Sequence, residues 1–189
     1  MILDAAHFTD YRAQKFGYDI LAKMPDSISY SLIIKENGDI HGLDDLVGQT
    51  VATLGAPSLG ATRLAAIFAN PARQPIITNV ATTDEAIEKL TQGKIHAAFL
   101  PSTDIIRAWS RLANVRVIVT TEPIPEAAIS ASPRLELSIR KAIQIALLHA
   151  AKTDDGRDML AQLSITGFSP ATSQLYAGYS NALKQYWGY

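Results

Sequence analysis

Residues 50–69 read TVATLGAPSLGATRLAAIFA, which is a β-branched apolar run, a loop of small residues and a stretch typical of a helix. The residues that follow repeat this alternation. Strands are predicted at 50–54, 75–80, 95–100 and 115–119, and helices at 61–69, 83–91 and 102–112. The spacing in the last helix places Ile105, Ile106 and Trp109 inward. Alternating strands and helices are typical of a mostly parallel sheet covered by helices, so this region predicts an α/β lobe.

The flanking segments predict a second, incomplete lobe. SISYSLIIK at 27–35 alternates like a strand. After the stiff EPIP sequence at 122–125, the predicted elements are a strand at 127–131, a helix that opens at Pro133, and helices at 154–163 and 172–186. Residues 1–32 are too few for a domain, so we expect them to pack with residues 121–189.

The predicted fold is therefore α/β and two-lobed. Residues 1–32 and 121–189 form a partial first lobe, and residues 33–120 form a complete second lobe with a parallel or mixed sheet. Two lobes joined by two crossovers make a hinge with a cleft, where a ligand is expected.

Composition excludes several classes of function. The formal net charge is -1 and no basic run occurs, so no nucleic-acid or anionic-membrane partner is expected. The absence of cysteine rules out disulfides, cysteine-based zinc sites and a thiol nucleophile. No apolar run approaches the ~20 residues that span a bilayer. MILDAAHFTD at 1–10 does not read as a signal peptide, and a strand predicted directly after Met1 suggests that upstream sequence is missing.

The junction LGAPSLGAT at 54–62 is the best local signal of a binding site. The first N–H groups of a helix have no partner within the helix, and its dipole favours negative charge there. Leu59, Gly60 and Ala61 bring such backbone to the loop, and Ser58 adds a hydroxyl, so phosphate, phosphonate or carboxylate could bind. The alternative is an ordinary Ser58 cap on a surface helix. The P-loop lysine and the GxGxxG glycines are missing.

Four further residues are candidate ligand contacts. Ser102 and Thr103 follow a predicted strand, where ligands of open sheets bind, or they cap the next helix. Tyr30 lies beside the first crossover, and its alternative role is a half-buried strand tyrosine. His7 follows the first strand and either faces the cleft or packs inside the lobe. No metal-ligand spacing, cofactor motif or catalytic constellation is present.

Several stretches, in order, resemble phosphate/phosphonate-type periplasmic binding proteins of ABC importers. LDDLVGQTVA at 43–52 is similar to that family's (D/E)DL-x-G-(K/R)-T-V-A stretch. The other matches are the Ser58 loop, AIEKLTQGKIHAA at 86–98, TTEPIP at 120–125, and the late residues Gly156, Leu160, Leu163, Ile165, Gly167, Phe168 and Tyr176. The family's consecutive loop hydroxyls are replaced by Leu59 and Gly60 after Ser58, and its D-A-A reads His96-Ala97-Ala98.

The resemblance implies a type 2 periplasmic binding protein that is not an enzyme. Such a protein closes around a small oxyanion in the periplasm and delivers it to an ABC permease in the membrane. In the family, a signal peptide and most of the first lobe precede the position of Met1, so a homodimer could complete that lobe. A ligand-sensing effector domain of a signalling or regulatory protein is the alternative, and an enzyme on the same fold is a third reading.

Overall fold

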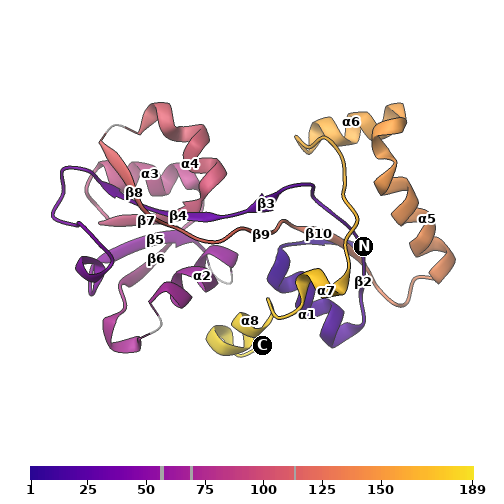
Figure 1. Ribbon diagram of the computed structural model, residues 1–189, viewed down its shortest axis with the longest axis horizontal. Coiled ribbons are helices and arrows are strands. Elements are labelled where there is room, and N and C mark those ends of the chain that lie inside the picture. Colours follow the sequence, from indigo (N-terminus) through magenta and orange to yellow (C-terminus); the bar gives the residue numbers. More distant parts are fainter. Residues whose placement is uncertain (56–57, 69, 113) are drawn as a thin grey trace. The chain divides into compact units, whose positions relative to one another are not determined.

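Figure 1 shows the computed structural model, which describes residues 1–55, 58–68, 70–112 and 114–189. Ala56 and Pro57 of the predicted binding loop, and the last residue of the predicted helix 61–69, lie outside the described residues. Within the part of the chain that is described, no helix has the length and apolar character needed to cross a membrane.

The chain divides into two units. Unit 1 comprises residues 1–27 and 124–189, and unit 2 comprises residues 28–123. The sequence predicts the changes of lobe at 32–33 and 120–121, whereas unit 2 also includes the whole of strand β4 (Tyr30–Lys35). Two short strands, β3 (Ser27–Ile28) and β9 (Ile124–Pro125), form a two-stranded sheet.

Unit 2 is built on a five-stranded mixed sheet with the order β6-β5-β7-β4-β8. Strand β5 is parallel to β6 and β7, and β4 is antiparallel to β7 and β8. The remaining strands are β5 (Thr50–Leu54), β6 (Ile76–Val80), β7 (Ala97–Pro101) and β8 (Val115–Thr120). The predicted α/β class is confirmed, and the sheet is mixed because β4 inserts between β7 and β8.

The centre of the sheet follows from apolar runs in the sequence. The first five residues of β4, YSLII, are buried, and so are all residues of β7, AAFLP. Strands covered on both faces read as continuous apolar runs rather than alternating ones. Ile33, Ala98 and Leu100 belong to one core cluster with residues of the covering helices. Burial of each large aliphatic side chain contributes about 2 kcal/mol to stability.

Three helices pack against this sheet: α2 (Leu59–Ile67), α3 (Thr83–Thr91) and α4 (Ser102–Ala108). Short 3-10 turns lie at Asp44–Leu46, Pro71–Arg73 and Trp109–Arg111. Helix α3 begins with a variant of the capping box, because Thr82 Oγ1 accepts from Glu85 N at 3.1 Å and Glu85 Oε2 accepts from Ala81 N at 2.8 Å. The sequence TTDE therefore fixes where this helix begins.

The predicted inward face of α4 is wrong for two of its three residues. Ile105 is buried, but Ile106 is 72% exposed and Trp109 is 50% exposed. Helix α4 has only seven residues before the chain tightens into a 3-10 turn at Trp109. The tighter turn moves Trp109 off the face that an α-helix would give it, and Ile105 and Ala108 make the buried contacts instead.

Unit 1 holds a three-stranded antiparallel sheet with the order β1-β10-β2. Its strands are β1 (Ile2–Asp4), β2 (Asp19–Lys23) and β10 (Ala128–Ala131). Its helices are α1 (Ala6–Phe16), α5 (Leu137–Leu148), α6 (Asp154–Gln162), α7 (Ser173–Tyr176) and α8 (Asn181–Trp187), with a 3-10 turn at Ala150–Lys152. Tyr176 is fully buried and donates to Glu126 O at 2.7 Å; burial raises the pKa of this hydroxyl, so it remains a donor.

Two helices of unit 1 differ from the sequence prediction. The helix expected to open at Pro133 begins at Leu137, because Leu135 N donates to Ser132 O in a turn and Glu136 is extended. The helix predicted at 172–186 is two helices, α7 and α8. They separate at Gly178, whose φ of 94° favours glycine, and both Gly178 N and Ser180 N donate to Asp10 Oδ2.

Candidate functional site at the edge of the unit 2 sheet

Four chain segments meet at one edge of the unit 2 sheet. The parallel strands β5 and β7 end there, at Leu54 and Pro101. Because β4 runs the opposite way, its first residue, Tyr30, pairs with Pro101, and Ser31 pairs with Thr120 at the end of β8. Helices α2 and α4 begin just beyond this edge. Ligands of open α/β sheets bind at such an edge.

Ser58 caps helix α2. Its Oγ accepts from Ala61 N at 3.1 Å and donates to Leu54 O at 2.7 Å. Both hydrogen bonds serve the turn from strand to helix, which is the ordinary capping role. The capping bond also engages the amide of Ala61. Ser58 and Ala61 thus hold the start of α2 in place, and their direct contact with a ligand stays a prediction.

Leu59 and Gly60 provide the first two amides of α2. N–H groups at these positions have no acceptor within a helix, and no described residue accepts a hydrogen bond from either of them. Both residues are buried. These two amides, rather than the Ser58 hydroxyl, are therefore the donors at the head of the helix.

Gly60 lies directly against two side chains of the sheet. A Cβ atom at this position would lie 3.0 Å from both Thr53 Oγ1 and Tyr30 Cε1, so glycine allows α2 to begin this close to β4 and β5. Tyr30 is buried, and its ring stacks on Phe99 with the ring centroids 5.6 Å apart. Thr53 is 1% exposed, and its Oγ1 has no hydrogen-bond partner among the described residues. Such orphaned hydroxyls are uncommon, so Thr53 is a candidate that the sequence analysis missed.

A chain of four hydroxyl groups, the hydroxyl chain below, lies at the same edge. Ser29 Oγ donates to Ser102 Oγ at 3.1 Å, and Ser102 Oγ lies 2.8 Å from Ser31 Oγ. Ser31 Oγ lies 2.9 Å from Thr120 Oγ1. Each hydroxyl both donates and accepts, so the chain can turn a donor toward an anion or an acceptor toward a cation. Of its four members, the sequence analysis named only Ser102.

The second predicted pair of hydroxyls is split by the structure. Ser102 does not cap α4, because the N-cap position is Pro101 and no side-chain bond closes that end. Thr103 is exposed and takes no part in the hydroxyl chain. Asp104, which would repel an anion, accepts from Thr83 Oγ1 at 3.0 Å and lies 3.6 Å from Arg107. Its charge is thus partly balanced outside the hydroxyl chain.

Arg63 is a cation of α2 that the sequence analysis did not single out. It follows Gly60 by about one helical turn, and its Nη2 donates to Glu122 O at 2.8 Å, two residues beyond β8. This bond holds a positive charge near the chain segments that form the site, where it favours an anion over a cation. The available signal was that Arg63 is the single charged residue within 50–69.

His7 belongs to unit 1 and is described within that unit. It is the second residue of α1, is 2% exposed, and has its ring centroid 4.5 Å from that of Phe8. This is the packed arrangement that the sequence left open as the alternative, and a contact with ligand stays a prediction. Among the described residues, no group of three or more His, Asp and Glu side chains is placed to hold a metal ion.

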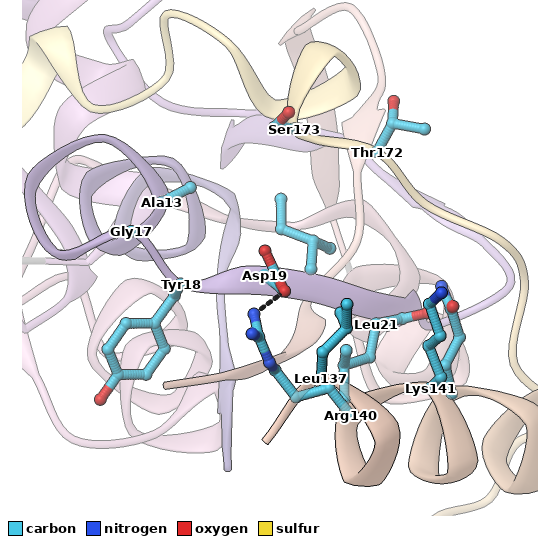
Figure 2. Close-up of a pocket in the computed structure, with 12 residues that line it drawn as sticks. Ala13, Gly17, Tyr18, Asp19, Leu21, Leu137, Arg140, Lys141, Thr172 and Ser173 are labelled. Carbon is cyan, nitrogen blue, oxygen red and sulfur yellow. Dashed lines mark hydrogen bonds and ion pairs between the residues drawn. The ribbon is translucent and has the colours of Figure 1, made fainter. Parts of the chain in front are cut away.

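A separate pocket of about 510 Å³ lies wholly within unit 1 (Figure 2). Residues of α1, β2 and α5 line it together with Thr172 and Ser173. It contains none of the residues that the sequence predicted for a binding site. Its chemistry is considered after the unit 2 site.

Comparisons with known proteins identify the family and the fold of the chain. The family model described as ABC transporter, phosphonate, periplasmic substrate-binding protein matches residues 1–176. No curated protein sequence gives a significant match.

Three solved structures show the likeness of fold. An ATP-bound protein of Xanthomonas citri has a TM-score of 0.82 at 16% identity, covering 97% of this chain and 78% of that one. PhnD1 from Prochlorococcus marinus in complex with methylphosphonate has a TM-score of 0.77 at 14% identity, covering 99% and 78%. A binding protein component of an ABC phosphonate transporter from Pseudomonas aeruginosa has a TM-score of 0.70 at 12% identity, covering 92% and 64%. The predicted type 2 periplasmic-binding-protein fold is confirmed.

Proposed function

Because this chain belongs to the ABC transporter phosphonate periplasmic substrate-binding protein family, we propose that unit 2 binds a small oxyanion, phosphate or a phosphonate, where β5 meets α2. Family membership makes the chain a solute-binding component of a transporter and confirms the prediction that it is not an enzyme. It also implies a periplasmic location, a small-molecule ligand and a membrane permease as partner.

The observation that carries the proposal is a set of three donors at the head of α2. Leu59, Gly60 and Thr53 are buried residues, and no described residue accepts a hydrogen bond from the first two amides or from the Thr53 hydroxyl. An oxyanion would supply acceptors to such donors, and the helix dipole favours its charge. A hydrogen bond to a charged group contributes about 1.5–3 kcal/mol. Micromolar binding corresponds to a binding free energy of about 8 kcal/mol. Two or three such bonds generally fall short of that value, so neighbouring residues must contribute as well.

The neighbouring residues would supply that support. The hydroxyl chain through Ser102 and the cation of Arg63 lie at the same edge of the sheet. The Tyr30 ring packs directly against Gly60, and the Ser58 cap stabilises the first turn of α2. Contributions from Thr103 and His7, and enclosure of the ligand between the two units, stay predictions.

Isothermal titration calorimetry of the chain with phosphate, methylphosphonate, sulfate and acetate tests the proposal. We expect phosphate or methylphosphonate to bind more tightly than acetate. Thr53→Val, which removes the hydroxyl and keeps the shape, should weaken that binding about tenfold, the equivalent of one hydrogen bond. The matched control is Thr78→Val on β6 of the same sheet, which should bind like the wild type. Absence of oxyanion binding, or equal binding by Thr53→Val and wild type, would refute the assignment.

We also propose that two copies of the chain associate through β1. Within the described residues β1 pairs only with β10, so its other edge can template a strand, and Leu3 on it is 47% exposed. Light scattering should give the mass of two chains for the wild type and of one chain for Leu3→Pro, since proline removes a ladder donor. A wild-type mass of one chain contradicts this. The alternative of a sensory effector domain has no support from the family model, which describes a transporter component.

A further inference from the structure

Helix α5 forms one wall of a pocket in unit 1 with Leu137 and three polar side chains. Leu137, Arg140, Lys141 and Gln144 are spaced three and four residues apart and so lie on one helical face. All four line the pocket of Figure 2, across from Asp19 to Leu21 of β2. Lys141 and Leu137 are exposed, so the pocket is open to solvent, whereas Arg140 is partly buried. The buried part of the Arg140 guanidinium is the feature that needs a partner.

The cations are incompletely neutralised. Arg140 Nη1 pairs with Asp19 Oδ2, but Arg140 Nε is buried and has no hydrogen-bond partner among the described residues. Lys141 extends from α5 toward β2 and makes no ion pair with a described carboxylate (Figure 2). Two positive residues and one negative residue line the pocket, which leaves it with one net positive charge.

The rest of the lining combines apolar side chains, the hydroxyl residues Tyr18, Thr172 and Ser173, and Gln144. Ala13, Ile20, Leu21 and Leu137 provide an apolar surface between the charged groups. Gln144 Nε2 donates to Leu21 O at 3.0 Å, so this side chain holds α5 to β2. The volume of about 510 Å³ falls within the range of small-molecule sites, about 300–1,000 Å³.

We propose that this pocket is a second ligand site, for a small organic monoanion that joins a carboxylate to a short alkyl chain. The carboxylate accepts hydrogen bonds from Arg140 Nε and Lys141 Nζ. It thereby gives Arg140 Nε a partner and neutralises the net positive charge of the lining. The alkyl chain lies against Leu21 and Leu137. The site lies entirely in unit 1 and does not depend on the oxyanion site proposed for unit 2.

Titration of the whole chain with hexanoate, butanoate and hexan-1-ol, followed by calorimetry, tests both parts of the ligand. Hexanoate should bind with millimolar affinity. Butanoate should bind about tenfold more weakly, because each buried CH₂ group is worth up to about fourfold. Hexan-1-ol, which lacks the charge, should also bind about tenfold more weakly. Failure of hexanoate to bind, or equal binding of hexanoate and hexan-1-ol, would overturn the proposal.

A pair of lysine variants locates the site. Lys141→Gln should weaken hexanoate binding at least about fivefold, whereas Lys152→Gln, an exposed lysine of the same unit, should leave it unchanged. Lys141 is chosen over Arg140 because the pair with Asp19 also anchors α5. Phosphate binding should be the same in both variants, which separates this site from that of unit 2. Wild-type affinity of Lys141→Gln for hexanoate would show the assignment to be wrong.

Discussion

Ser31 Oγ lies 2.8 Å from Ser102 Oγ, although 71 positions of sequence separate the two residues. The contact exists because β4 inserts between β7 and β8, so that Ser31 also reaches Thr120 at 2.9 Å on its other side. One antiparallel strand thereby joins hydroxyls from three separate segments into a single chain. Ser102 stands in the middle of it, bonded to both Ser29 and Ser31.

Ser102→Ala should lower the affinity for methylphosphonate about tenfold, because it cuts the hydroxyl chain and removes one adjustable donor. Calorimetric titration measures the change. The control is Ser110→Ala, an exposed serine of the same unit, which should bind like the wild type. If both variants bind equally well, the hydroxyl chain has only a structural role.

Variants of two capping residues of unit 2 can distinguish an effect on stability from an effect on ligand binding. Ser58 caps α2 and Thr82 caps α3, each through one bond of 3.1 Å to a backbone amide. Replacement of either by alanine should lower the free energy of unfolding by about 1 kcal/mol in urea titrations. Only Ser58→Ala should also weaken oxyanion binding, since α2 carries the amides of Leu59 and Gly60. Equal binding by Ser58→Ala and Thr82→Ala would contradict the role given to α2.

The start of α3 should become less stable in acid. The Lys89 ammonium, and then the Ala81 amide, hold the pKa of Glu85 below its ordinary value of 4.5. A carboxylate with a lowered folded-state pKa stabilises the native state above its unfolded pKa, and this stabilisation is lost as the pH falls through the folded value. The wild type should therefore have a higher Tm than Glu85→Gln at pH 7. This difference in Tm should shrink below about pH 4.5. A difference in Tm that is independent of pH would show that the charge is not involved.

Much of unit 2 could be predicted from sequence because burial leaves a direct pattern. TVATL and SLIIK are apolar strands, and the TTDE sequence before α3 fixes a helix start. The turn from strand to helix around Gly60 could be predicted because a strand, a loop of small residues and a helix occur in order. These signals are local, so a single sequence contains them.

The features that were missed depend on contacts between distant segments. The orphaned state of Thr53 follows from the close approach of α2 at Gly60, which strand propensity does not encode. The hydroxyl chain needs the position of β4 between β7 and β8. Trp109 was placed inward because periodicity assumes an α-helix throughout, whereas the chain tightens there.

The same reasoning applies to the carboxyl-terminal helices, where a buried carboxylate breaks the predicted helix. Asp10 is 2% exposed and accepts hydrogen bonds from Gly178 N at 3.1 Å, Ser180 N at 2.8 Å and Gln14 Nε2 at 2.8 Å. Asp10→Ala should lower the free energy of unfolding by about 2 kcal/mol or more, because it leaves these donors without an acceptor. It should also speed proteolysis near residues 177–180, which urea titration and limited digestion would measure together.

The matched control is Asp158→Ala, an exposed aspartate of α6 in the same unit. Surface substitutions of this kind usually change stability by no more than about 0.5 kcal/mol. Should Asp10→Ala match this control in stability and in digestion rate, the separation of α7 from α8 would have to be caused by Gly178 alone. In that case Gly178→Ala, at a residue with a φ of 94°, would lower the free energy of unfolding more than Asp10→Ala does. We expect the opposite: Asp10→Ala should lower it at least as much as Gly178→Ala.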